Sequence, residues 1–175
     1  MAQIRSEMMG KCIMIIDVQK GFISPETEYV VERIEGLLQR ESFDKVIATQ
    51  FINAEESPYR RFIKWNKLSE PPETDVHEVV AKNADKIFTK NVYSAANSEV
   101  LAYLKRNKID EIFLAGIDTD CCILKTAADF FEKNMDAKVL AYYTASNGGK
   151  ESRYAAMRVL KRMIGEEQIY RKKYL

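Results

Sequence analysis

The segment EIFLAGIDTDCCILKTAADFFE, residues 111–132, decides the fold class because its hydrophobic period changes partway along. Residues 111–116 form the short apolar run typical of a buried β-strand, whereas residues 120–134 repeat apolar side chains with the period of an amphipathic helix. Cys121 and Cys122 lie at the start of this expected helix. Each thiol has four possible roles: inert core residue, redox partner, metal ligand or nucleophile.

The same alternation of strand and helix continues along the chain, which predicts an α/β protein. The apolar runs are continuous rather than alternating, so the strands are expected to be buried on both faces of a mostly parallel sheet covered by helices. We expect a single domain over residues 1–175. Further strands are predicted at 12–16, 45–50, 86–89 and 137–143, with a weaker one at 168–170; further helices are predicted at 94–107 and 150–163.

Composition narrows the range of partners. The chain has 27 Lys plus Arg and 26 Asp plus Glu, so its near-neutral charge gives no reason to expect nucleic acid or an anionic membrane as a partner. The apolar run near the N-terminus is too short for a secretion signal or a membrane span, which favours a cytoplasmic location. The three cysteines show no C-x-x-C spacing. We therefore expect reduced thiols, no cofactor and a small-molecule partner.

Three reactive side chains follow predicted strands. In open parallel sheets the ligand lies beyond the carboxyl ends of the strands. Asp17 follows the first run, and Lys90 follows the third. Cys122 lies in the first helical turn after the fourth run, six residues past Gly116. Each has a plain structural interpretation as a loop cap, a surface lysine or a small core residue, but their joint occurrence at one sheet edge favours a catalytic site.

A helical wheel separates the two cysteines. At 100° per residue, Cys122 falls with the polar residues and Cys121 lies at the boundary of the apolar stripe. A cysteine kept for packing would be expected in the stripe. The first helical turn also favours an anion, so we expect the pKa of the Cys122 thiol to be lowered and Cys122 to be the nucleophile. A disulfide between adjacent cysteines would need a peptide geometry that a regular helix does not allow.

Three motifs together resemble one family of enzymes. The segments CIMIIDVQKGF (12–22), FTKNVYSA (88–95) and LAGIDTDCCILKTAADFFEKNMDAKVLAYYTASNGG (114–149) resemble the isochorismatase-like cysteine hydrolases, a superfamily that includes nicotinamidases and N-carbamoylsarcosine amidase. The likeness covers roughly residues 10–165. It implies a Rossmann-like, three-layer αβα fold with a six-stranded sheet in the order 3-2-1-4-5-6.

The resemblance also implies roles for particular residues. The family signature G-x-x-T-D-x-C-[VI]-x-x-T places the nucleophile on Cys122, and the family's catalytic aspartate and lysine fall on Asp17 and Lys90. It implies a cis peptide between Ile117 and Asp118, with the backbone N–H groups of Asp118 and Cys122 forming an oxyanion hole. The implied reaction is cleavage of a C–N bond in a small amide or carbamoyl compound through a covalent acyl-enzyme. The family also implies a homo-oligomer, a dimer or larger.

The sequence departs from some members of that superfamily. Members that cleave isochorismate carry glycine in place of the cysteine, whereas this chain keeps Cys122. Nicotinamidases carry an Asp-x-His element after the second strand, and a further histidine, to bind a metal; here Phe51, Ile52 and Asn53 stand in that place, and the only histidine is His77. We therefore expect no metal and little activity on nicotinamide.

The insert NAEESPYRRFIKWNKL, residues 53–68, has Ser57 as a candidate N-cap and Pro58 at the first helical position. It has two interpretations: a lid that carries Arg60, Arg61 or Trp65 into the pocket, or a short amphipathic helix that packs Phe62 and Trp65 against the body with its arginines in water. The expected pocket residues are Phe22, Asn53, Arg60, Trp65 and Tyr93.

The third strand should lie two spacings, roughly 10 Å, from the first. We therefore expect that Lys90 cannot reach the site unaided and that the loop after it folds inward over the site. The competing hypothesis is a catalytically silent binding or scaffold protein on the same fold. Nucleotide binding is not favoured, because no G-x-G-x-x-G follows the first strand.

Overall fold

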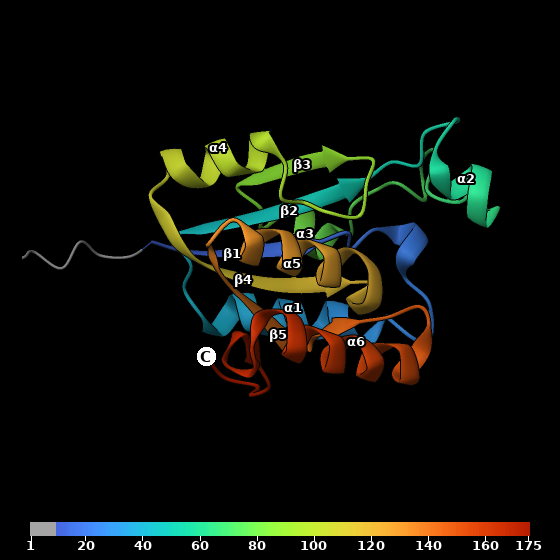
Figure 1. Cartoon of the computed structure of the whole chain (residues 1–175). Helices are drawn as coiled ribbons and strands as arrows, with labels where there is room; N and C mark the ends of the chain where they lie inside the picture. Colours follow the sequence, from blue (N-terminus) through green and yellow to red (C-terminus); the bar gives the residue numbers. More distant parts are fainter. Residues whose placement is uncertain (1–9) are drawn as a thin grey trace, which may run out of the picture.

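The computed structural model describes residues 10–175, and its centre is a six-stranded sheet in the order β3-β2-β1-β4-β5-β6 (Figure 1). Every neighbouring pair in the sheet is parallel. The predicted strands and their order are therefore confirmed. The strands are β1 (Gly10–Ile16), β2 (Lys45–Phe51), β3 (Lys86–Lys90), β4 (Ile109–Ile117), β5 (Asp136–Ala145) and β6 (Ile169–Tyr170).

Helices cover both faces of the sheet, which confirms the three-layer αβα arrangement. Side chains of α1 and α3 join the core on one face, and those of α4, α5 and α6 join the core on the other. Helix α2 stands apart, beyond the carboxyl end of β2 (Figure 1). The helices are α1 (Tyr29–Arg40), α2 (Pro58–Ile63), α3 (Glu78–Ala81), α4 (Ser98–Arg106), α5 (Leu124–Glu132) and α6 (Gly149–Ile164).

Strand β1 shows why a continuous apolar run forms the middle of this sheet. Its side chains alternate between two cores: Met14 and Ile16 pack toward α4–α6, and Ile13 and Ile15 pack toward α1. All four are fully buried. Full burial of one such side chain contributes about 1.5–3 kcal/mol, so neither face of β1 tolerates a polar residue.

Helix α1 covers one face of the sheet and is not among the helices predicted from the sequence. Its buried residues are Val30, Ile34 and Leu37, at the spacing of one helical face. The periodic signal was thus present in the sequence. None of the helices within residues 10–175 combines the length and apolar character needed to cross a bilayer.

The carboxyl ends of β1 and β4 approach each other closely at Gly116. This residue has φ +123°, and a Cβ atom placed on it would lie 2.1 Å from the carbonyl oxygen of Ile16. Only glycine can adopt this backbone conformation at such a close approach. Because Asp17 follows Ile16 and Cys122 follows Gly116 by six residues, this contact sets the spacing of the candidate site.

We predict that Gly116→Ala lowers the free energy of unfolding by more than about 4 kcal/mol, because it combines backbone strain with a steric clash. Gly165→Ala is the matched control: Gly165 has φ +91°, but its added Cβ would meet no atom within 4 Å. The control should cost only about 1–3 kcal/mol, from backbone strain alone. Urea denaturation measures both values. Equal losses in the two variants would show that the contact between β1 and β4 does not constrain the fold.

Candidate active site

Three reactive side chains meet at the carboxyl edge of the sheet, as the sequence predicts. Asp17 follows β1, Lys90 is the last residue of β3, and Cys122 lies in a π-helical turn, Thr119–Ile123, that precedes α5. The Lys90 Nζ atom lies 2.6 Å from Asp17 Oδ2 and 3.6 Å from Cys122 Sγ. The side chains of Asp17 and Lys90 are 0% and 1% exposed. The structure therefore holds an ion pair, withdrawn from water, against a thiol.

The neighbouring strand β2 orients Asp17. The residue adopts a left-handed backbone conformation with φ 51°, and its N–H donates to Thr49 Oγ1 over 3.1 Å. The Thr49 hydroxyl in turn donates to Asp17 Oδ1 over 2.6 Å. One carboxylate oxygen is thus fixed by Thr49, and the other faces Lys90.

Lys90 reaches Asp17 differently from the expected way. Its own side chain spans the gap, because it crosses the neighbouring strand with Nζ 5.2 Å from the centroid of the Phe51 ring. The loop after β3 does not carry Lys90 to the site but provides hydrogen-bond acceptors for it. Lys90 Nζ donates to the carbonyl oxygens of Val92 and Tyr93 over 2.9 and 3.1 Å. The expectation that Lys90 needs the loop in order to reach the site is corrected to a loop that fixes the ammonium group.

The position of Cys122 also differs from the helical-wheel prediction. The Ile123 N–H donates to the carbonyl oxygen of Asp118, five residues earlier, over 3.1 Å. This π-helical turn breaks the regular 100° step, so the wheel was wrong at its first residues. Cys122 is 4% exposed and belongs to the core on the α4–α6 face. Cys121 is half-buried, and both thiols are free.

Burial sets the protonation of the site. It raises the pKa of the Cys122 thiol well above the ordinary value, and the negative charge of Asp17 raises it further; Lys90 lowers it without offsetting these effects. The expected lowering of the Cys122 pKa was therefore wrong. Burial alone lowers the pKa of Lys90, but Asp17 and Cys122 outweigh it and the net pKa is raised. The resting site thus contains a neutral thiol beside a carboxylate–ammonium pair.

The backbone before Cys122 has the features implied by the family resemblance. The peptide between Ile117 and Asp118 is cis. Within residues 10–175 the Asp118 N–H has no hydrogen-bond acceptor. The Thr119 hydroxyl donates to the carbonyl oxygen of Ala145 over 3.0 Å and so ties this turn to β5. The Asp118 N–H is therefore available to an atom bound in the site.

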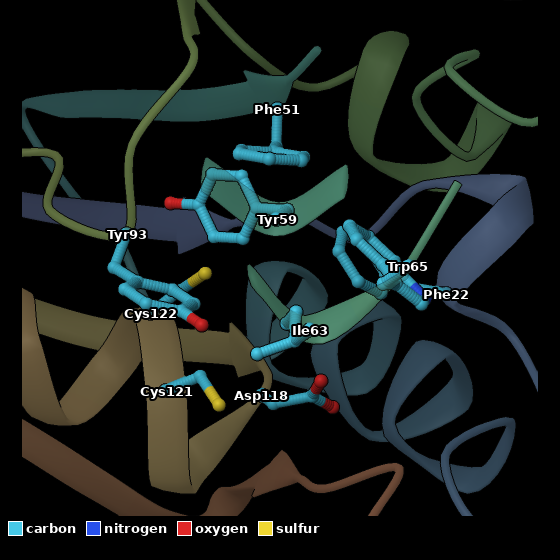
Figure 2. Close-up of a pocket in the computed structure, with 9 residues that line it drawn as sticks. All are labelled: Phe22, Phe51, Tyr59, Ile63, Trp65, Tyr93, Asp118, Cys121 and Cys122. Carbon is cyan, nitrogen blue, oxygen red and sulfur yellow. The ribbon is translucent and has the colours of Figure 1, made fainter. Parts of the chain in front are cut away.

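A cavity of about 280 Å³ lies above the thiols (Figure 2). Phe22, Trp65 and Tyr93, three of the five predicted pocket residues, line it. Its wall is mainly aromatic, and Cys121, Cys122 and the Asp118 side chain provide the polar part. The full lining is Phe22, Phe51, Tyr59, Ile63, Trp65, Tyr93, Asp118, Cys121 and Cys122.

The other two predicted pocket residues, Asn53 and Arg60, do not line the cavity. The Asn53 side chain donates to the carbonyl oxygens of Trp65 and Lys67 over 3.0 and 2.9 Å. Arg60 donates to Ser69 Oγ over 2.5 Å. Both side chains thus fold the insert back on itself, which places Trp65 in the wall.

Helix α2 forms part of the wall through residues that the sequence analysis missed. Its N-cap is Ser57, as predicted, whose side chain accepts a hydrogen bond from the Arg60 N–H over 3.3 Å. Tyr59 and Ile63, four residues apart and so on one face of the helix, line the cavity. Phe62, which the second interpretation of the insert packs against the body, is 69% exposed. The helical spacing of Tyr59 and Ile63 was the available signal.

The residues present do not fit a metal centre of the nicotinamidase kind. Phe51 is a wall residue and Asn53 is occupied by carbonyl groups. His77 caps α3, where its Nδ1 atom accepts a hydrogen bond from the Val79 N–H over 3.3 Å. Within residues 10–175 no group of three or more His, Cys, Asp or Glu side chains is arranged so that it could hold a metal ion. The donor set of such a site is therefore missing here.

Comparison with known proteins agrees with the fold and the motifs. The family model for the isochorismatase domain matches residues 11–167. The chain belongs to the isochorismatase family.

Three similar proteins illustrate the relationship. Isochorismatase family protein 1A of Dictyostelium discoideum is 37% identical over 79 residues, which span 44% of this chain and 38% of that protein's length. An isochorismatase-like hydrolase from Alkaliphilus metalliredigens superposes with a TM-score of 0.79 at 19% identity, over 92% of this chain and 94% of the other. N-carbamoylsarcosine amidase from Thermoplasma acidophilum superposes with a TM-score of 0.76 at 20% identity, over 93% and 95%. The two structural likenesses establish the fold.

The pKa shift of Cys122 predicts how its alkylation depends on pH. Because the pKa is raised, iodoacetamide should label Cys122 slowly at neutral pH, and the rate should still be rising at pH values where an ordinary thiol has levelled off. Asp17→Asn removes a negative charge that raises the pKa, so the midpoint of the profile of labelling rate against pH should move to lower pH. Peptide mass mapping over a pH series measures the rates. A midpoint for Cys122 that moves to higher pH in Asp17→Asn would contradict the charge arrangement.

Proposed function

We propose that this protein is a cysteine hydrolase that cleaves a C–N bond in a small amide or carbamoyl compound. The observation that carries the proposal is the Cys122 thiol, which borders a cavity on one side and the Asp17–Lys90 ion pair on the other. A nucleophile beside a base that is itself oriented by a third group is the arrangement required for covalent catalysis. A structural neighbour named as an N-carbamoylsarcosine amidase supports this class of substrate.

In the first half of the reaction, Cys122 Sγ attacks the carbonyl carbon while Asp17 accepts the thiol proton. Lys90 keeps its positive charge throughout and offsets the negative charge that passes from Asp17 to sulfur and then to the carbonyl oxygen. The N–H groups of Asp118 and Cys122 hold that oxyanion. Loss of one such donor in other acyl-transfer sites costs about 3 kcal/mol of transition-state stabilisation.

The intermediate then collapses. The C–N bond breaks, Asp17 returns its proton to the leaving nitrogen, and a thioester on Cys122 remains. In the second half, a water molecule attacks the thioester carbonyl while Asp17 accepts its proton. The C–S bond breaks, and the proton returns to sulfur. Asp17 thus accepts one proton and gives one up in each half of the reaction, and the site returns to its starting state.

The proposed mechanism uses no metal and no cofactor. The raised pKa of Cys122 agrees with a base that removes the proton during attack, rather than with a thiolate stored beforehand. Because residues 10–175 provide no metal site that could bind a pyridine nitrogen, nicotinamide should be a poor substrate.

The alternative, a catalytically silent binding protein on the same fold, makes the buried ion pair difficult to explain. Two charges without water are costly to bury, and replacing such a pair by apolar residues is often neutral or stabilising. Asp17 and Lys90 both interact with the Cys122 thiol, which lines the cavity. A purely binding protein would gain nothing from this arrangement.

We predict that Cys122→Ser lowers turnover by about 10³-fold or more, whereas Cys121→Ser stays within about tenfold of the unchanged protein. Because both thiols line the cavity, comparing the two variants separates the effect of losing the nucleophile from the effect of changing the cavity wall. The measurement is ammonia release from a panel of small primary amides and carbamoyl compounds, with circular dichroism to check folding. Full activity of Cys122→Ser, or loss confined to Cys121→Ser, would refute the assignment. Hydrolysis of no member of the panel by the unchanged protein would favour the binding protein.

A further inference from the structure

We infer that the cavity selects substrates that carry a cationic group, an alkylated ammonium close to the scissile amide, and that the Asp118 side chain is the specificity-determining residue. The inference rests on the proposed function for the reaction itself. Its basis is the pairing of an aromatic wall with one carboxylate that has no cationic partner.

The wall of the cavity consists of aromatic rings from four separate segments. Phe22 and Trp65 stack with centroids 5.8 Å apart, and Tyr59 meets Phe51 and Tyr93 edge to face at 5.0 Å each (Figure 2). These contacts fix the rings in place before any ligand arrives. Ring faces attract cations within about 6 Å of their centroid, Trp most strongly.

Asp118 contributes the carboxylate. Its Oδ1 atom accepts hydrogen bonds from the Asn147 N–H over 2.7 Å and from Asn147 Nδ2 over 3.0 Å, which orients the group. Within residues 10–175 no Lys, Arg or His lies within ion-pair distance of it, and Oδ2 accepts no hydrogen bond. Asp118 is half-buried, and the cavity lining contains no basic side chain.

The surrounding charges increase the need for a cation. Burial raises the pKa of Asp118 to about 6, and the charges of Asp120 and Asp17 add to the effect, while Asn147 opposes it. The carboxylate is therefore mostly ionised at neutral pH, in surroundings that disfavour its charge. Lys67 and Asp118 both border the adjoining hollow, but among residues 10–175 the Lys67 ammonium does not come within ion-pair distance of the Asp118 carboxylate. A ligand cation is thus the natural counter-ion for Asp118.

The geometry leaves room for this cation away from the reacting atoms. Figure 2 shows the Asp118 carboxylate on the opposite side of the cavity from Phe51, the ring over which Lys90 lies. Lys90 is already paired with Asp17. The cavity, about 280 Å³, lies at the lower end of the range for ligand sites, so the cationic group must lie close to the amide. An anionic substrate would meet Asp118 without compensation.

The first test compares amides of the same shape and different charge. The probes are (trimethylammonio)acetamide, its neutral isostere 3,3-dimethylbutanamide, in which a tert-butyl group replaces trimethylammonium, and anionic succinamate. We expect kcat/KM for the cationic amide to exceed that for the neutral one by about tenfold or more, with succinamate lowest. In Asp118→Asn the ratio of cationic to neutral should fall at least about fivefold. Glu132→Gln, which removes an exposed charge at the end of α5, is the matched control and should keep the ratio.

The second test needs no turnover. Calorimetric titration of the unchanged protein with choline and with its carbon isostere, in which a tert-butyl group replaces trimethylammonium, should show tighter binding of choline by about fivefold or more, lost in Asp118→Asn. Choline preference without hydrolysis of any amide would refute the hydrolase and keep the cation site. Equal binding of the two compounds, binding of neither, or equal kcat/KM for the two isosteric amides would overturn the inference.

Discussion

The ion pair between Asp17 and Lys90 is the interaction around which this site is arranged. Both side chains are fully withdrawn from water, so each charge depends on the other and on the groups around it. Thr49 fixes the carboxylate, and the carbonyl oxygens of Val92 and Tyr93 fix the ammonium. Removing either partner would leave an uncompensated buried charge, which typically costs 3–5 kcal/mol. The pair thereby links β1, β2, β3 and the loop after β3 at one edge of the sheet.

A second constraint brings the thiol to that pair. Strands β1 and β4 are neighbours at the centre of the sheet, and Gly116 allows their ends to approach closely. The π-helical turn that follows then places Cys122 between the ion pair and the cavity rather than on the solvent side of a regular helix. The helix-terminus dipole, which the sequence suggested as the source of thiolate stability, is outweighed here by burial and by the charge of Asp17.

Local patterns in the sequence predicted the strands and the meeting of Asp17, Lys90 and Cys122, because continuous apolar runs and the residues that follow them are visible in neighbouring positions. The order of the strands was implied by the resemblance to the family, since strand order depends on contacts between distant segments. The pKa of Cys122 was predicted with the wrong sign, since burial depends on packing among distant segments. Asn53 and Arg60 were misplaced for the same reason: their hydrogen bonds form within the folded insert. Tyr59 differs from these two residues, because its spacing of four residues from Ile63 is visible in the sequence and predicts that both side chains lie on one face of a helix.

The central claim is that Cys122 becomes acylated during turnover, and intact-protein mass spectrometry tests it most directly. The unchanged enzyme is quenched in acid during steady hydrolysis of an amide identified by ammonia release, then weighed and digested. The account predicts a species heavier by the acyl group of that amide, with the added mass on the peptide containing Cys122 and lost in Cys122→Ser. Acylation of another residue, or enzyme that stays unmodified throughout steady hydrolysis, would contradict it.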